Sequence, residues 1–168
     1  MPMRPFIDRF PIPGIAETRS LKLTGHASLP DGEYGFIEMY CDERECDCRR
    51  VMVAVLRPRT GWSKVWATIS YGWEDAGFYR AWGPHSDPLE MQGPNLNPLG
   101  PQSRYSHALL ELFRTLIESP EYIERLKRHY AMFREAIGRE HGAIGRVLHE
   151  HGARRRGRGS QRGRPRGL

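Results

Sequence analysis

All three cysteines of this chain lie within eight residues, at positions 41, 46 and 48 of its 168 residues. Thiols grouped this closely among charged residues are typical of a site that binds a soft metal ion, with zinc the first candidate. A turn between two strands can curl around such an ion and bring the sulfurs to it. We therefore expect Cys41, Cys46 and Cys48 to bind one structural zinc ion. Two alternatives remain open: ordinary reduced cysteines in a turn, or a redox pair formed by Cys46 and Cys48.

A closed zinc site needs a fourth ligand, and the chain has no fourth cysteine. His129 is a candidate because it flanks the apolar face of a predicted helix, and Asp42 and Asp47 are candidates because they adjoin the cysteines. Arg49 and Arg50 follow the last cysteine directly. Their positive charge is expected to favour thiolates over thiols at this site.

The sequence predicts an α+β fold in which a small antiparallel sheet packs against two C-terminal helices. Runs rich in aromatic and β-branched residues predict three strands that form a meander, with the cysteines between the first two. These runs cover residues 33–41, 49–57 and 64–73. Amphipathic spacing predicts a helix over 103–118 and another that follows the Ser119-Pro120 cap. The positions expected to be buried on these helices are Leu109, Leu112, Phe113, Leu116, Tyr122, Leu126, Tyr130, Phe133 and Ile137.

The other segments are expected to be short or irregular. Four prolines predict an irregular arm over residues 1–19, followed by a short strand near Leu21 and Leu23. Residues 58–61 should form a turn, and residues 74–82 a short helix that packs Phe78 and Trp82 inward. Residues 83–101 should wrap over the core. The side chains expected to anchor that wrap are Leu89, Met91, Leu96 and Leu99. A separate short helix through Ile144, Val147 and Leu148 should end near Gly152.

The basic charge of the chain is concentrated at its C-terminus. The formal net charge is +6, from 26 Lys and Arg against 20 Asp and Glu. Seven of those arginines lie between Arg154 and Arg166, so the body carries 19 basic and 20 acidic residues, a balance of −1. We predict one domain over residues 1–152 and a disordered Arg/Gly-rich tail over 153–168. The near-neutral body predicts no nucleic-acid groove of its own.

The first residues show no charged start followed by an apolar run, and no apolar stretch reaches the length of a membrane span. Three cysteines are an odd number for a disulfide framework. We therefore expect reduced thiols, no membrane partner and a cytoplasmic location.

The sequence motifs of several enzyme classes are absent from this chain. There is no P-loop, no G-x-G-x-x-G, no G-x-S-x-G and no deaminase pattern of H-x-E with C-x-x-C. We predict a zinc-stabilised binding domain, with weak and non-specific nucleic-acid binding through residues 154–166 and a protein partner as a further option. The alternative is a metal-dependent hydrolase that uses the three-cysteine zinc site with Glu38 or Glu45 as base.

The run from Tyr40 to Val51, Y-C-D-x-x-x-C-D-C-R-R-V, resembles the signature of an uncharacterised bacterial protein family. Further similar runs are A-T-I-S-Y-G-W at 67–73, P-Q-S at 101–103 and R-H-Y-A-M-F at 128–133. The resemblance covers residues 33–134 and implies a shared metal-knuckle domain without an established activity. The C-x-C spacing also resembles the SEC-C zinc motif. The Gly-Ser-Gly-Lys and the terminal cysteines of that motif are absent from this sequence, so its function is not carried over.

Overall fold

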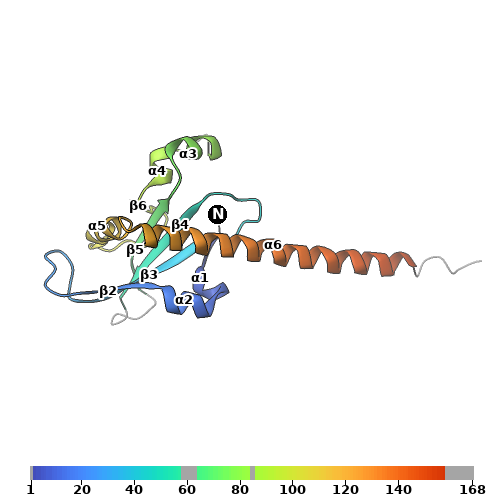
Figure 1. The fold of residues 1–168 in the computed structure, drawn as a ribbon, viewed down its shortest axis with the longest axis horizontal. Coiled ribbons are helices and arrows are strands. Elements are labelled where there is room, and N and C mark those ends of the chain that lie inside the picture. The colour runs from blue at the N-terminus through green and yellow to red at the C-terminus, as the bar shows by residue number, and fades with distance from the viewer. Residues whose placement is uncertain (1, 58–63, 84–85, 158–168) are drawn as a thin grey trace, which may run out of the picture.

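The computed structural model describes residues 2–57, 64–83 and 86–157 (Figure 1). Its centre is a six-stranded antiparallel sheet in the order β1-β3-β4-β5-β6, with β2 paired to β3 beside this path. The strands are β1 (Met3–Pro5), β2 (Arg19–Leu23), β3 (Gly32–Cys41), β4 (Arg50–Leu56), β5 (Val65–Gly72) and β6 (Asn95–Leu96). The predicted α+β fold and its three-stranded meander, now β3, β4 and β5, are confirmed.

Alternation along the central strands gives the sheet one face that is covered by helices. On β3 this face carries Phe36 and Tyr40, and on β4 it carries Val53, which pairs with Ile69 of β5. Helices α5 (Ser106–Leu116) and α6 (Pro120–Gly157) pack on this face. The ring of Phe36 lies 6.4 Å from that of Phe113 on α5, and Tyr40 lies 5.7 Å from Phe133 on α6. Eight of the nine positions predicted from the helical pattern are buried, and Leu112 is half-buried.

Helix α6 begins where its cap residue predicts and ends later than expected. The Tyr122 backbone N–H donates to Ser119 Oγ at 3.4 Å, so Ser119 caps the helix. The predicted break before a separate short helix is wrong, because α6 runs without interruption to Gly157 and extends beyond the sheet (Figure 1). Isolated glycines cost a helix only about 1 kcal/mol each, and the chain has no proline between Pro120 and Pro165 to stop it. Residues 158–168 of the predicted tail lie outside the described residues.

No helix in the described ranges combines the length and the apolar composition needed to cross a bilayer.

The N-terminal segment is regular rather than the predicted irregular arm. It forms β1, then α1 (Phe6–Arg9) and α2 (Pro11–Glu17), then β2. Strands β1 and β2 pair with opposite ends of the same edge of β3, at Met39–Cys41 and at Gly32–Phe36. The prolines that suggested irregularity are compatible with this, because Pro11 occupies the first turn of α2, where its missing N–H is not needed.

The segment between β5 and α5 contains α3 (Ala76–Trp82), α4 (Pro88–Gln92) and β6. The expected inward packing is confirmed for Trp82, which is half-buried against the core, and is wrong for Phe78, because Tyr79 is the fully buried side chain of α3. The expected anchoring by Leu89 and Leu99 is also wrong, because they are 68% and 96% exposed.

Backbone and amide hydrogen bonds hold the end of this segment instead. The Asn97 N–H and the Gln102 side-chain amide each donate to the Thr68 carbonyl at 2.8 Å. The turn predicted at 58–61 lies in a range that the structure does not describe.

One polar cluster is buried between β3, α6 and α2. His129 Nδ1 lies 2.7 Å from Glu38 Oε2, and its Nε2 lies 3.0 Å from Glu17 Oε2. The Tyr40 hydroxyl donates to the same Glu38 oxygen at 2.8 Å, and the Phe6 ring stacks on the imidazole with 4.0 Å between centroids. His129 is 1% exposed and Glu38 5% exposed, while the Glu17 side chain is 35% exposed, so a buried pair and one partly exposed carboxylate tie the N-terminal helices to the body.

Removing one member of this cluster is expected to cost more than removing an exposed charge. His129→Leu leaves the buried Glu38 carboxylate without its imidazole partner and should lower the free energy of unfolding by about 3 kcal/mol. A double-mutant cycle with Glu38→Gln, measured by urea unfolding, should show a coupling above about 1 kcal/mol. The control is Glu124→Gln, which removes an exposed ion pair with Lys127 and should change stability by less than about 0.5 kcal/mol. Additive effects in the cycle would contradict this account.

Candidate metal centre

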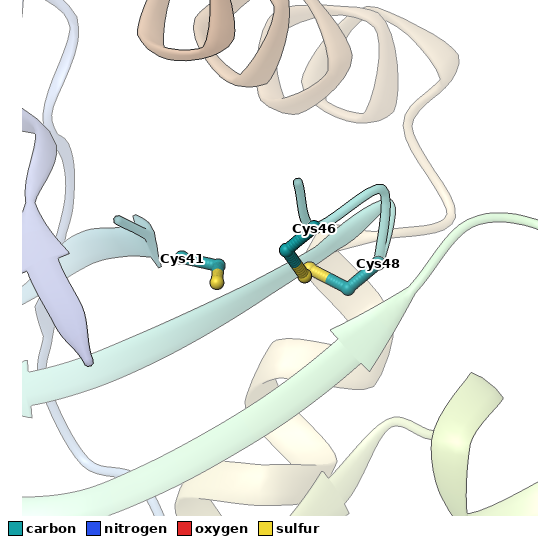
Figure 2. Close-up of side chains that lie close together, drawn as sticks. All are labelled: Cys41, Cys46 and Cys48. Carbon is teal, nitrogen blue, oxygen red and sulfur yellow. The ribbon is translucent and has the colours of Figure 1, made fainter. Parts of the chain in front are cut away.

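The three cysteines converge at the junction of β3 and β4. Cys41 is the last residue of β3, while Cys46 and Cys48 lie on the loop 42–49 that leads to β4. Their sulfur atoms all lie within 4.8 Å of one another, and no disulfide joins them. In Figure 2 the sulfurs of Cys46 and Cys48 lie next to each other, and the Cys41 side chain approaches from the strand. An ideal tetrahedral zinc site places its sulfurs about 3.8 Å apart, so this arrangement fits such an ion with a small contraction.

Each sulfur has a backbone N–H donor two residues further along the chain. The donor belongs to Glu43 for Cys41, to Cys48 for Cys46 and to Arg50 for Cys48, and in each case it lowers the pKa of the thiol. Cys41 and Cys48 are buried and Cys46 is half-buried. A buried thiolate needs hydrogen-bond donors for its negative charge, so the loop conformation is suited to thiolate ligands.

The thiols are nevertheless protonated when no metal is present. Burial raises the pKa of Cys41 to about 11, and burial together with a neighbouring thiol also raises the pKa of Cys46 and of Cys48. The prediction that the adjacent arginines would keep these cysteines as thiolates is therefore wrong. Arg50 does lower the pKa of Cys48, but the effect of burial is larger. A metal ion must displace protons to bind here.

The three predicted candidates for the fourth ligand are all engaged elsewhere. His129 faces a carboxylate oxygen with each ring nitrogen, so both nitrogens are engaged away from the three sulfurs. Asp47 accepts hydrogen bonds from Arg49 and Tyr130, and Asp42 pairs with two arginines of the N-terminal segment. Within the described residues, the ligand atoms that gather at this point are the three sulfurs alone. A fourth position is thus left for a small exogenous ligand or water, as in open zinc sites.

The two predicted catalytic bases are also unsuited to the centre. Glu38 points to the helix-covered face of the sheet, where it contacts Tyr40 and His129. The Glu45 side chain is 89% exposed and pairs with Arg44. Neither carboxylate is placed to take a proton from a metal-bound water.

The turn after Cys48 requires an unusual backbone conformation. Arg49 has a φ of 48°, and it is the one non-glycine residue with positive φ in the described residues. This left-handed conformation costs about 1–2 kcal/mol for a residue with a Cβ atom. Two tyrosine hydroxyls stabilise it: Tyr79 donates to the Arg49 carbonyl at 2.8 Å, and the Arg49 N–H donates to Tyr130 Oη at 3.4 Å. Helices α3 and α6 thus hold the turn that positions Cys48.

The rest of the loop is held by arginines from distant segments. Arg4 and Arg9 pair with Asp42, the residue after Cys41, at 3.0 and 2.8 Å. Arg134 of α6 donates to the carbonyls of Glu43 and Arg44. The sequence analysis identified none of these residues or the two tyrosines as parts of the site. Local spacing carries no signal for them, because their partners lie between 30 and 91 positions away along the chain.

Removing the Tyr79 hydroxyl should weaken the loop without disturbing the core. Tyr79→Phe leaves the Arg49 carbonyl without its donor, so we expect the free energy of unfolding to fall by about 1–2 kcal/mol. Metal affinity should fall as well, because Cys48 is then less well positioned. Tyr105→Phe is the matched control, since its hydroxyl contacts Arg104 away from the loop. Equal effects of the two variants on metal affinity would contradict the role given to Tyr79.

Metal binding should depend steeply on pH. Since all three thiols carry raised pKa values, binding at neutral pH should release close to three protons, countable by calorimetric titration in buffers of different ionisation enthalpy. The same raised pKa makes the stability of the metal-free protein depend on pH. The folded pKa of Cys41 lies above its ordinary value of 9.0, so its contribution to stability is present below pH 9 and is lost as pH rises towards about 11. Release of fewer than two protons would contradict this account.

Comparisons with protein-family models, with curated protein sequences and with solved structures gave no significant match. The resemblance of residues 40–51 to an uncharacterised bacterial family therefore stays a prediction. The three cysteines within 4.8 Å of one another are a group that could hold a metal ion.

Proposed function

We propose that the protein is a small binding domain whose loop between β3 and β4 is fixed by one zinc ion on Cys41, Cys46 and Cys48. The convergence of three sulfurs within 4.8 Å, each with its own backbone N–H donor, carries this proposal. Zinc is preferred among metals because it is redox-inert and accepts three thiolates with one lighter ligand. Thiol ligands require a reducing compartment, and we infer a cytoplasmic location on that ground.

A structural role fits the surroundings of the site better than a catalytic one. The loop 42–49 contains no helix or strand. The backbone N–H groups of Asp42 and Cys46 donate to the carbonyls of Pro2 and Glu43, and a bound ion would add a further constraint to these and to the side-chain contacts. The middle residues of the loop, Glu43, Arg44 and Glu45, are exposed. A metal at the base of the loop would hold these charged side chains in one arrangement. Such an arrangement suits recognition of a partner, and in the described ranges neither Glu38 nor Glu45 stands beside the sulfurs as a base for hydrolysis.

We predict one zinc per chain, measured by elemental analysis of the purified protein. Cys46→Ser should lose most of the metal, whereas Ser28→Ala, a substitution of an exposed residue on another loop, should retain it. Structural zinc in small domains contributes about 10–16 kcal/mol of apparent binding energy. Chelation should therefore lower the melting temperature clearly. An unchanged melting temperature after complete removal of the metal would contradict a structural role.

We also propose weak, sequence-independent nucleic-acid binding by residues 154–166. The charge of the chain supports this, because seven arginines lie there while the body has a balance of −1. Arginine binds phosphates without reading base sequence, so the interaction should be electrostatic.

Truncation at Ala153 provides the test for the tail. Binding of a fluorescent oligonucleotide by the full chain should weaken with salt, with a slope of up to about −0.9 in log affinity per phosphate contacted. Binding should disappear in the truncated protein. Replacement of the seven arginines by lysine is the control, since it keeps the charge and should keep most of the affinity. Full affinity in the truncated protein would move the binding surface to the body.

A further inference from the structure

A cavity of about 320 Å³ lies beside the cysteine loop, on the face of the sheet opposite to α5 and α6. Its walls include Cys48 from the loop, Met52 from β4, Ser70 from β5 and Asn97 from the segment after β6. A second cavity of about 530 Å³ shares some of these walls and continues towards α4. The two cavities meet at the residues that line both of them, which are Arg50, Ser70, Asn97 and Leu99.

Arg50 is a largely covered positive charge without a carboxylate partner in the described part of the chain. Its Nε atom is buried and has no hydrogen-bond partner. One of its terminal nitrogens donates to the Met91 sulfur at 3.3 Å, which is a weak acceptor. A guanidinium that is removed from water needs a compensating negative charge, because its desolvation costs several kcal/mol. The other arginines around the loop meet this need with carboxylates or carbonyl oxygens, whereas Arg50 does not.

A hydroxyl donor stands in the same cavity. The Asn97 side-chain amide donates to Ser70 Oγ at 2.9 Å, so the Ser70 hydroxyl keeps its own proton for another acceptor. Asn97 is itself fixed by the Leu99 N–H, which donates to its Oδ1 at 2.9 Å. Arg50 is the one charged residue among those lining the 320 Å³ cavity, and the side chains of Met3 and Met52 form apolar walls.

We propose that this cavity binds a small organic anion, with its oxyanion head on Arg50 and Ser70 and its apolar body against Met3 and Met52. A carboxylate or a phosphate head matches the flat fork of donors that a guanidinium presents. The volume suits a ligand of a few to a dozen non-hydrogen atoms and lies at the small end of the range for ligand pockets. Arg50 is not a metal ligand in the function proposed above, so the anion site is a separate property of the domain.

The test uses the metal-loaded full chain and follows its melting temperature at constant ionic strength. The probes are inorganic phosphate, acetate, butyrate and hexanoate, with chloride as the reference anion. We expect a saturable rise for at least one oxyanion. A larger rise along the carboxylate series would identify an organic acid as the ligand class, and a rise with phosphate alone would identify a phosphate ester.

Variants assign the effect to this cavity. Arg50→Gln should abolish the saturable rise, and Ser70→Ala should weaken the apparent affinity about five- to tenfold. Arg114→Gln, on the exposed surface of α5, is the matched control and should respond like the wild type. Arg50→Lys keeps the charge while losing the fork, so it should fold even where Arg50→Gln does not, and it should bind more weakly.

Metal content, measured in every variant, separates this proposal from the zinc site. Loss of zinc from Arg50→Gln, with no response of the wild type to any oxyanion, would show that Arg50 only balances the metal–thiolate charge and would overturn the proposal. A response that Arg50→Gln retains would overturn it too. Conversely, a saturable response that depends on Arg50 would support the anion site even if elemental analysis found no zinc.

Discussion

Three sulfur atoms converge within 4.8 Å of one another where the loop 42–49 joins the two central strands, β3 and β4. Segments from several parts of the chain contact this loop. Strand β3 pairs with β1, β2 and β4, and its end at Cys41 pairs with Met3 of β1, beyond the last pair with β4 at Met39. The loop that follows has no regular structure to fix it. One metal ion on three thiolates would connect the end of β3 to the start of β4 and supply the constraint that backbone pairing does not.

Contacts from three other segments prepare the loop for that ion. Helices α3 and α6 place tyrosine hydroxyls on the strained backbone of Arg49, and the N-terminal segment places two arginines on Asp42. These contacts offset the cost of the left-handed turn and hold three N–H groups towards the sulfurs. These contacts do not make the thiols ionise, because burial favours the neutral form and raises the pKa of each thiol. Binding of a metal ion by these thiols would therefore require the loss of their protons.

The parts of the structure that depend on local pattern were predictable from the sequence. Aromatic and β-branched runs predicted β3, β4 and β5, and three- and four-residue spacing predicted the buried face of α6. The parts that depend on long-range contacts were not. His129 was a reasonable fourth ligand by position, but carboxylates 91 and 112 residues away occupy both of its ring nitrogens. The hydrogen bond from the Tyr79 hydroxyl to the Arg49 carbonyl was not predicted. An amphipathic pattern distinguishes buried from exposed positions, but it does not show which carbonyl accepts a hydrogen bond from a buried hydroxyl.

The X-ray absorption spectrum of zinc in the full-length protein tests this account most directly. The three-cysteine centre predicts three sulfur neighbours at about 2.3 Å and one lighter nitrogen or oxygen neighbour at about 2.0–2.2 Å. In Cys46→Ser the sulfur count should fall by one in whatever metal remains bound. A zinc ion with fewer than three sulfur neighbours in the wild-type protein would contradict the centre proposed for Cys41, Cys46 and Cys48.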